Sequence, residues 1–295
     1  MKLSEKYYSG RDVQRLLGIS EPQLRTLVSN KKLKKIIPPG RKTAVYLKSE
    51  VEGYAEQWEA FLMAKDPPKT TFKIADLEDM EDEHDLDARA VGPNGMPTEL
   101  RKTWLEPNPE SDYHVYHNNK LVAFMHLVPL KHEIIEGSMQ GTISWRDIDP
   151  KTAIEKYELG KPIELFVEGI ASDPDTSEIN RMHYMLVLIR NAGIELKKLG
   201  QRGIIVTKVY GKSQTPTGIA MATHAGMMEY LPRKGKMMRF VLDVEHSTTY
   251  LARKYKEGFE EWQKEQKRYN KEKRKTKVSL NEKQKVIASS SPENE

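Results

Sequence analysis

A break within the first hundred residues decides how this chain can fold. Asp66-Pro67-Pro68 ends one folded segment, because proline donates no backbone hydrogen bond and the residue before it avoids the helical conformation. Eight acidic side chains and no basic one follow at 76–87, and Gly92-Pro93-Asn94-Gly95-Met96-Pro97 has strong turn chemistry. The sequence therefore predicts a small domain at 1–65, an acidic, Pro/Gly-rich linker at 66–98, a larger domain at 99–245 and a helical tail at 246–295.

Composition excludes several classes of protein. The 295 residues include no cysteine, which excludes disulfides and thiolate zinc sites and favours a reducing, cytoplasmic location. No run of eighteen apolar residues occurs, and the N-terminus lacks the apolar stretch of a secretory signal. We therefore expect a cytoplasmic protein with no membrane partner, and we predict no bound metal.

Positive charge is concentrated at the N-terminus. Residues 1–48 carry twelve Lys and Arg side chains against three acidic ones, although the whole chain has a net charge of only +5. This segregation indicates a polyanionic partner for the N-terminal domain. The tail from Arg253 to Lys277 is basic too, and beyond Tyr269 its composition predicts disorder.

The N-terminal domain shows two short helices, a hairpin and a third helix. Apolar residues recur at helical spacing, and Ser9 and Asp12 have the separation of a capping pair. Ser20 and Gln23 form a capping box for the second helix. The predicted elements are helices at 10–17 and 21–29 joined by Gly18-Ile19-Ser20, strands at 30–37 and 43–47 joined by a tip at 38–42, and a helix at 50–63.

This pattern resembles the winged helix-turn-helix domain of MerR-type and excisionase-type proteins. The resemblance implies that residues 21–29 enter the major groove of double-stranded DNA while the hairpin and basic side chains contact phosphates. The matching residues are Tyr8-Ser9-Gly10-Arg11-Asp12-Val13, Leu17-Gly18-Ile19-Ser20, Leu24-Arg25, Leu33 and Gly40-Arg41-Lys42. The implied DNA-binding residues are Arg11, Glu21, Gln23, Arg25, Thr26, Lys31, Lys32, Lys34, Lys35, Arg41 and Lys42.

Residues 99–245 alternate strands and helices, which predicts a mixed α/β domain. Asn118-Asn119 suits the positive backbone angles of a tight hairpin turn. The tail begins as an amphipathic helix whose apolar stripe, Leu251 to Trp262, packs on this domain or on another subunit. The predicted elements are a hairpin at 112–128, a strand at 163–171, a long helix at 178–199 closed by Gly200 and Gly203, a buried strand at 204–210, a short helix at 217–223 and a final strand at 236–242.

This order resembles the fold of the GNAT acyltransferase family. The matching segments are 119–124, Val167-Glu168-Gly169-Ile170-Ala171-Ser172-Asp173-Pro174 with the helix after it, Gly218-Ile219-Ala220 and Ala225-Gly226-Met227. The resemblance implies that the strand ending at Ala171-Ser172 pairs with the pantetheine arm of acetyl-CoA. It also implies that the next helix binds the pyrophosphate through backbone amides. The implied cofactor-binding residues are Ile170, Ala171, Ser172, Asn180 and Arg181.

The phosphate-binding segment departs from the family pattern. Residues 176–183 contain no glycine, although close approach of backbone to phosphate favours it, and Glu178 would repel a phosphate. Ala222 stands where the family often has a general-acid tyrosine. Candidate substitutes are Glu168 as a base and His183 or His224 as proton donors. These departures argue against ordinary acetyl-CoA catalysis, so no cofactor is required.

The whole sequence predicts an α+β protein of two domains, a winged helix-turn-helix and a GNAT-like mixed α/β domain with a helical tail. The leading hypothesis is a sequence-specific DNA-binding transcriptional regulator, active as a homodimer because one winged module makes few base contacts. Its GNAT-like domain would be a sensor for a small molecule or a docking platform for a protein effector. The alternatives are an active acetyl-CoA-dependent N-acetyltransferase targeted by its DNA-binding module and an excision or partition factor of a phage or mobile element.

Overall fold

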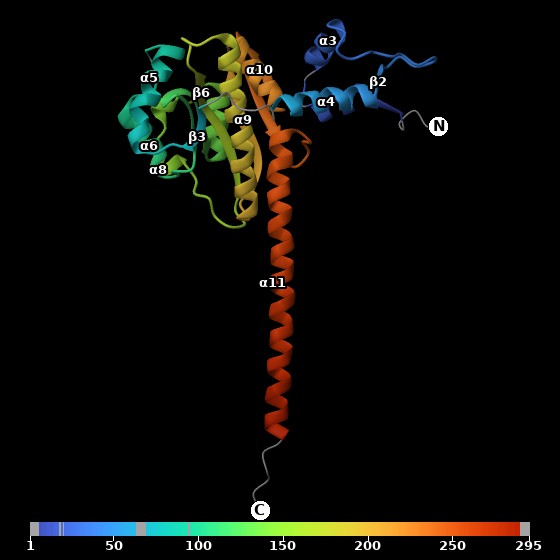
Figure 1. The fold of residues 1–295 in the computed structure, drawn as a ribbon, viewed down its shortest axis with the longest axis vertical. Coiled ribbons are helices and arrows are strands. Elements are labelled where there is room, and N and C mark those ends of the chain that lie inside the picture. Colours follow the sequence, from blue (N-terminus) through green and yellow to red (C-terminus); the bar gives the residue numbers. More distant parts are fainter. Residues whose placement is uncertain (1–5, 18, 20, 63–68, 94, 290–295) are drawn as a thin grey trace, which may run out of the picture.

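The structure, a computed structural model, describes residues 6–17, 19, 21–62, 69–93 and 95–289. It contains a small N-terminal unit, a larger unit built on a seven-stranded sheet, and a helix that extends far beyond that sheet (Figure 1). Within the described ranges, no helix combines the length and apolar character that a membrane span requires.

The N-terminal unit encloses its own small core. Its elements are β1 (Tyr7–Ser9), α2 (Gly10–Leu17), α3 (Glu21–Ser29), β2 (Val45–Leu47) and α4 (Lys48–Leu62). The capping pair is confirmed, because Ser9 Oγ donates to Asp12 Oδ2 at 2.7 Å and the Asp12 amide donates to Ser9 Oγ at 3.3 Å. Gly18 and Ser20 of the predicted turn lie outside the described residues. The core residues are Val13, Ile19, Leu24, Leu33, Tyr46 and Val51.

The predicted hairpin forms only in part. Residues 30–37 are not a strand, and Ile36 makes a single antiparallel bridge to Val45. Pro38 and Pro39 cannot donate to a ladder, which limits the pairing near the tip. The tip is nevertheless a tight turn, since the Arg41 amide donates to the Pro38 carbonyl at 3.1 Å and Gly40 has a φ of +76°. β2 instead forms an antiparallel pair with β1. This pairing was not predicted, because β1 is only three residues long and has no clear strand pattern.

The larger unit is built on a mixed sheet with the strand order β3-β4-β5-β6-β7-β9-β8. Among the described neighbouring strands of this sheet, only β6 and β7 pair in parallel, and α9 connects them. The predicted hairpin turn is confirmed by φ angles of 51° at Asn118 and 63° at Asn119. This is the predicted GNAT-like α+β arrangement. The strands are β3 (Thr70–Ile74), β4 (Asp112–His117), β5 (Lys120–Pro129), β6 (Pro162–Ser172), β7 (Ile205–Ser213), β8 (Met228–Lys234) and β9 (Met237–Asp243).

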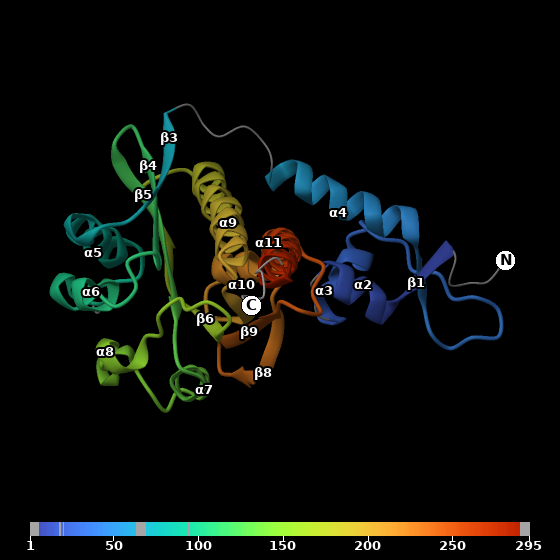
Figure 2. The ribbon, with the colours of Figure 1, turned by 90° about the horizontal axis from the view of Figure 1, so that it is seen from below.

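Helices cover both faces of the sheet. In Figure 2, α9 and α11 lie on one side and α5 and α6 on the other. The α9 face holds the main apolar core, whereas the α5 face also buries charged side chains. The helices are α5 (Met80–Ala90), α6 (Thr98–Leu105), α7 (His132–Gln140), α8 (Pro150–Ala153), α9 (Glu178–Gln201), α10 (Pro216–His224) and α11 (Tyr250–Ser289), with short 3₁₀ turns at Leu77–Asp79 and Trp145–Asp147.

The prediction of an unpacked linker at 66–98 is wrong for most of that segment. Residues 70–74 form β3 at the edge of the sheet, paired with β4. α5 buries Met80 and Leu86 completely, and its Glu83 is 1% exposed. Glu83 forms an ion pair with Arg101, which lies outside the acidic run. The local composition of the run therefore gave no sign that Glu83 could be buried.

The tail helix packs against the larger unit, one of the two predicted outcomes. Leu251 and Tyr255 are buried, and the Tyr255 hydroxyl accepts from the Val206 amide at 3.0 Å and donates to the Ile204 carbonyl at 3.0 Å. The expectation of disorder beyond Tyr269 is contradicted, because α11 continues to Ser289. Lys, Glu and Gln make up much of this stretch, and their high helix propensity favours the continued helix.

The close contact of α9 with α11 yields a stability prediction. A Cβ atom on Gly258 of α11 would lie 2.0 Å from the carbonyl oxygen of Lys197 on α9. We expect Gly258→Ala to lower the free energy of unfolding by about 1–3 kcal/mol, since the two backbones must separate. Thermal and denaturant unfolding measure this. Gly53→Ala in α4, where a Cβ meets nothing within 4 Å, is the control and should not destabilise; equal effects at both positions would contradict the packing argument.

Candidate functional site

A cavity opens where β6 and β7 part. Their ladder ends at the pair Val167–Gly211, while β6 continues to Ser172. The cavity has a volume of about 720 Å³ and is lined by the ends of both strands, the segment between α5 and α6, and the first turns of α9 and α10. Pockets that hold small molecules commonly have about 300–1,000 Å³. The topology therefore provides a ligand-sized space at the carboxyl ends of the two parallel strands.

Glu168 is an acidic residue of this cavity. Its side chain is 16% exposed, and burial raises the pKa of its carboxyl group to about 7, although Arg101 and Lys212 oppose that shift. A carboxyl group with a pKa near neutrality can accept or release a proton under ordinary conditions. The structure thus places the predicted base candidate inside the cavity.

His126 of β5 lies next to Glu168 and was not among the predicted site residues. Its Nδ1 atom is 4.0 Å from Glu168 Oε2, and its ring meets Trp104 edge-on at 5.7 Å between centroids. Burial lowers the pKa of His126 to about 4, so the ring is neutral at pH 7. Residues 121–129 of β5 are all buried, so the strand has no alternation of polar and apolar positions that would single out His126 in the sequence.

Besides Arg101, the cationic side chains of Arg181 and Lys212 line the cavity. Arg181 lies in the first turn of α9, and its Nε atom is buried with no hydrogen-bond partner. Lys212 on β7 donates from Nζ to the Ser138 hydroxyl at 3.0 Å, and burial lowers its pKa. A buried guanidinium nitrogen without a partner at a helix N-terminus suits an anionic ligand group.

The predicted cofactor and catalytic residues divide between the cavity and other places. Ile170, Ala171, Ser172 and Arg181 line the cavity, whereas Asn180 is exposed and its amide donates to Ser177 Oγ at 3.3 Å. His183 is half-buried on α9 and is not among the described lining residues. The side chain of His224 lies outside the described part of α10.

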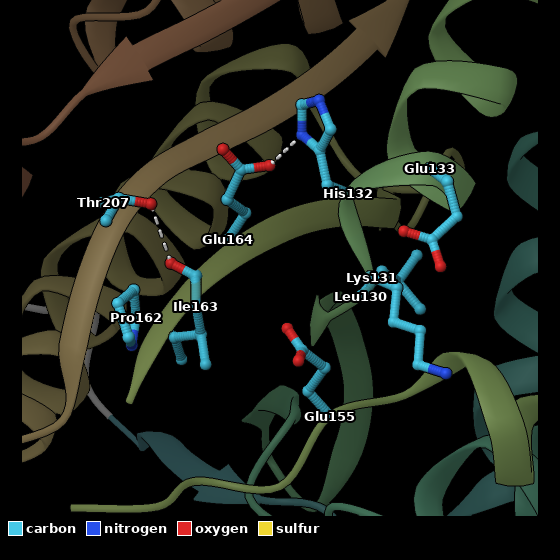
Figure 3. A pocket seen from close by; sticks show the side chains of 9 residues that line it. All are labelled: Leu130, Lys131, His132, Glu133, Glu155, Pro162, Ile163, Glu164 and Thr207. Atoms are coloured by element: carbon cyan, nitrogen blue, oxygen red, sulfur yellow. Dashed lines mark hydrogen bonds and ion pairs between the residues drawn. The ribbon is translucent and has the colours of Figure 1, made fainter. Parts of the chain in front are cut away.

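A second pocket of about 430 Å³ opens elsewhere along β6 (Figure 3). His132 Nδ1 lies 2.7 Å from Glu164 Oε2, and the Tyr210 hydroxyl donates to the other oxygen of Glu164 at 3.4 Å. The Thr207 hydroxyl donates to the Ile163 carbonyl at 3.0 Å. These polar groups satisfy one another, which makes this pocket a weaker candidate than the cavity.

The predicted DNA-binding residues lie on the surface of the N-terminal unit. Arg25 forms an ion pair with Glu21 at 2.5 Å on α3, and both side chains are well exposed. The side chain of Gln23 lies outside the described part of α3. The remaining predicted residues are all exposed: Arg11, Thr26, Lys31, Lys32, Lys34, Lys35, Arg41 and Lys42.

Comparison with known proteins finds related folds among solved acetyltransferases. No protein-family model and no curated protein matches the sequence. Similar structures include a ribosomal-protein alanine N-acetyltransferase from Escherichia coli (14% identity, 59% of this chain and 93% of that chain, TM-score 0.36). Others are a GNAT-family acetyltransferase from Streptococcus pneumoniae (8%, 59% and 98%, 0.39) and PaiA N-acetyltransferase from Thermoplasma acidophilum (11%, 59% and 98%, 0.37). Nothing about substrate or activity follows from similarity at this level.

The raised pKa of Glu168 predicts a pH-dependent stability. Because the folded-state pKa of about 7 exceeds that of an exposed glutamate, the native state holds a proton that the unfolded state has lost. Wild-type stability should fall as pH rises from about 5 to 8, by at most on the order of 3 kcal/mol from this group. Glu168→Gln, which cannot ionise, should lack that fall. Denaturant unfolding of both proteins at several pH values measures it, and parallel curves would refute the assignment.

Proposed function

We propose that this protein is a sequence-specific double-stranded DNA-binding protein that acts as a transcriptional regulator, and that its GNAT-like unit senses a small ligand. The observation that carries the proposal is the separation of side chains in the N-terminal unit. Its apolar residues form one core, while every described side chain among the predicted DNA contacts is exposed. Multiple exposed cations on one small unit supply the sequence-independent part of DNA affinity.

The arrangement of these elements supports a winged helix-turn-helix mode of binding. α2 and α3 are consecutive short helices, and the exposed face of α3 presents Arg25 and Thr26. Arg41 closes the turn that contains Gly40, and Lys42 follows it directly, so both cations lie at the hairpin tip. In this mode α3 contacts base edges and the tip contacts phosphates. A homodimer would double the few base contacts that one unit offers.

The cavity supports the sensing role and indicates the class of ligand. Arg181, whose Nε atom has no hydrogen-bond partner, and the N-terminus of α9 favour a phosphate or carboxylate group. Glu168 and Lys212 also line the cavity and would contact a polar part of the same molecule. A ligand seated here would bridge α5, α9 and the sheet.

Removing the two tip cations tests DNA binding. We expect the double variant Arg41→Ala/Lys42→Ala to bind all DNA sequences more weakly, and each lost phosphate contact should reduce the slope of log affinity against log salt by about 0.9. Fluorescence anisotropy with a fragment selected from a random pool measures both quantities. Lys151→Ala, an exposed lysine of α8 on the other unit, is the matched control. No salt-dependent binding by the wild type would refute the proposed function itself.

A second candidate function is acyl transfer, favoured by the position of Glu168. As a carboxylate in the cavity, Glu168 could take the proton from a protonated amine or from the amine as it attacks an acyl thioester. The new bond joins the amine nitrogen to the acyl carbon, the carbon–sulfur bond breaks, and the thiolate leaves. The fit to acetyl-CoA is mixed: Arg181 suits its phosphates, whereas Glu178 and the absence of glycine at 176–183 do not.

Glu168→Gln tests acyl transfer. If the cavity acetylates amines, this change should lower kcat/KM by about 10²–10⁴-fold, the usual contribution of a general base, while acetyl-CoA still binds. Glu164→Gln is the control, because Glu164 lies on the same strand in the second pocket. Calorimetry measures binding, and release of free thiol measures turnover. Failure of the wild type to bind acetyl-CoA would exclude this candidate and leave the DNA-binding role intact.

A further inference from the structure

A buried cluster beneath α5 contains three side chains of metal-binding type. Glu83 of α5 and Asp112 and His114 of β4 are 1%, 2% and 0% exposed. One ligand atom from each lies within 4.8 Å of the other two. Glu83 Oε2 is 2.9 Å from His114 Nε2, which is 3.8 Å from Asp112 Oδ1. Metal-bound oxygen and nitrogen atoms at about 2.0–2.2 Å from an ion have similar mutual separations.

The carboxyl groups around this cluster outnumber the cation that is paired with them. Glu83, Asp87 and Asp112 are three carboxyl groups, and Arg101 is the cation paired with them, through Glu83 and through Asp87 at 2.5 Å. With all three carboxylates ionised, the group carries a net charge of −2. Uncompensated charge is costly in a dry interior, so either protons or a dication must balance it.

Hydrogen bonding around His114 leaves its Nε2 atom facing the carboxylates. The single hydroxyl proton of Tyr116 is donated to Asp79 Oδ1 at 2.9 Å. The hydroxyl oxygen is therefore free to accept from His114 Nδ1, 3.4 Å away, and this contact would hold the ring proton on Nδ1 once Nε2 binds an ion. Nε2 donates to Glu83 Oε2 at 2.9 Å when no ion is bound, so metal binding would release that proton and turn the Nε2 lone pair toward the ion.

One oxygen in the cluster has no hydrogen-bond partner among the described residues. Asp112 Oδ1 is buried and makes no hydrogen bond within the described structure. The Asp112 side chain is only 2% exposed, and its Oδ1 atom faces the His114 ring rather than solvent. A buried acceptor without a donor requires an explanation, and a bound ion supplies one.

We propose that Glu83, Asp112 and His114 bind one divalent transition-metal ion of the Zn²⁺ or Mn²⁺ class. One imidazole and two carboxylates match the donor preference of these ions, and the dication cancels the net charge of the cluster. Arg101 on Glu83 and Tyr116 on His114 act as outer partners that orient the ligands. The ion would fasten α5 to β4, directly behind Asp87 and Arg101, which line the cavity. This inference replaces the sequence-based expectation of no metal.

Metal titration of the full-length protein tests the site. After treatment with a chelator, the wild type should bind one equivalent of Zn²⁺ or Mn²⁺ in calorimetry, and its Tm should rise with the ion. Asp112→Asn keeps the size of the side chain and removes the charge, and it should bind on the order of a hundredfold more weakly. Tyr116→Phe removes only an outer partner and should cost about 10–100-fold.

Two comparisons keep the test decisive. His132→Gln removes an exposed histidine paired with Glu164 and should bind metal as the wild type does, which excludes surface binding. Asp112→Asn should remain folded, as judged by circular dichroism, because Asn resembles a protonated aspartic acid. Failure of the wild type to bind either ion, or equal binding by the wild type, Asp112→Asn and Tyr116→Phe, would overturn the proposal and assign the charge balance to protons.

Discussion

The parallel pairing of β6 with β7 is the constraint on which the rest of the larger unit depends. Two parallel neighbours require a crossover connection, which α9 provides, and this connection fixes α9 against one face of the sheet. Because the two strands part after Val167, their carboxyl ends leave room for a cavity beside the N-terminus of α9. The same local geometry thus creates the space, brings Glu168 into it and aims a helix N-terminus at it.

The two faces of the sheet bury different kinds of side chain. The α9 face is an apolar core that the tail helix extends through Leu251 and Tyr255. The α5 face buries charge as well as apolar side chains, and Glu83, Arg101 and His114 pair with one another there. Buried polar groups specify a unique arrangement only when they are all satisfied. The proposed ion would complete that network and hold α5, a wall of the cavity, in place.

The proposed roles of the two units can be linked through the helices that line the cavity. The N-terminal unit offers a charged surface with a small core, while the larger unit offers a cavity with ionisable side chains. α4 of the N-terminal unit contacts α9, and α9 also lines the cavity. A ligand seated in the cavity would therefore act on the N-terminal unit through α9.

Local sequence determined the elements whose signals are short-range. The Ser9–Asp12 cap, the Asn118-Asn119 turn and the long helix after Asp173 were all predictable, because capping, turn chemistry and periodicity act within a few residues. The position of Glu168 on a strand was predictable as well. The sequence by itself also determined the charged character of the N-terminal unit.

Only the tertiary structure decided which distant groups meet. The acidic segment at 76–87 reads as solvated until Arg101 and His114 are placed against Glu83, so α5 was missed and its burial was decided by contacts across the chain. His126 was missed for the same reason, since its place behind Glu168 depends on the pairing of β5 with β6. Burial and pairing across long separations set the properties of ionisable groups, and neither leaves a local pattern in the sequence.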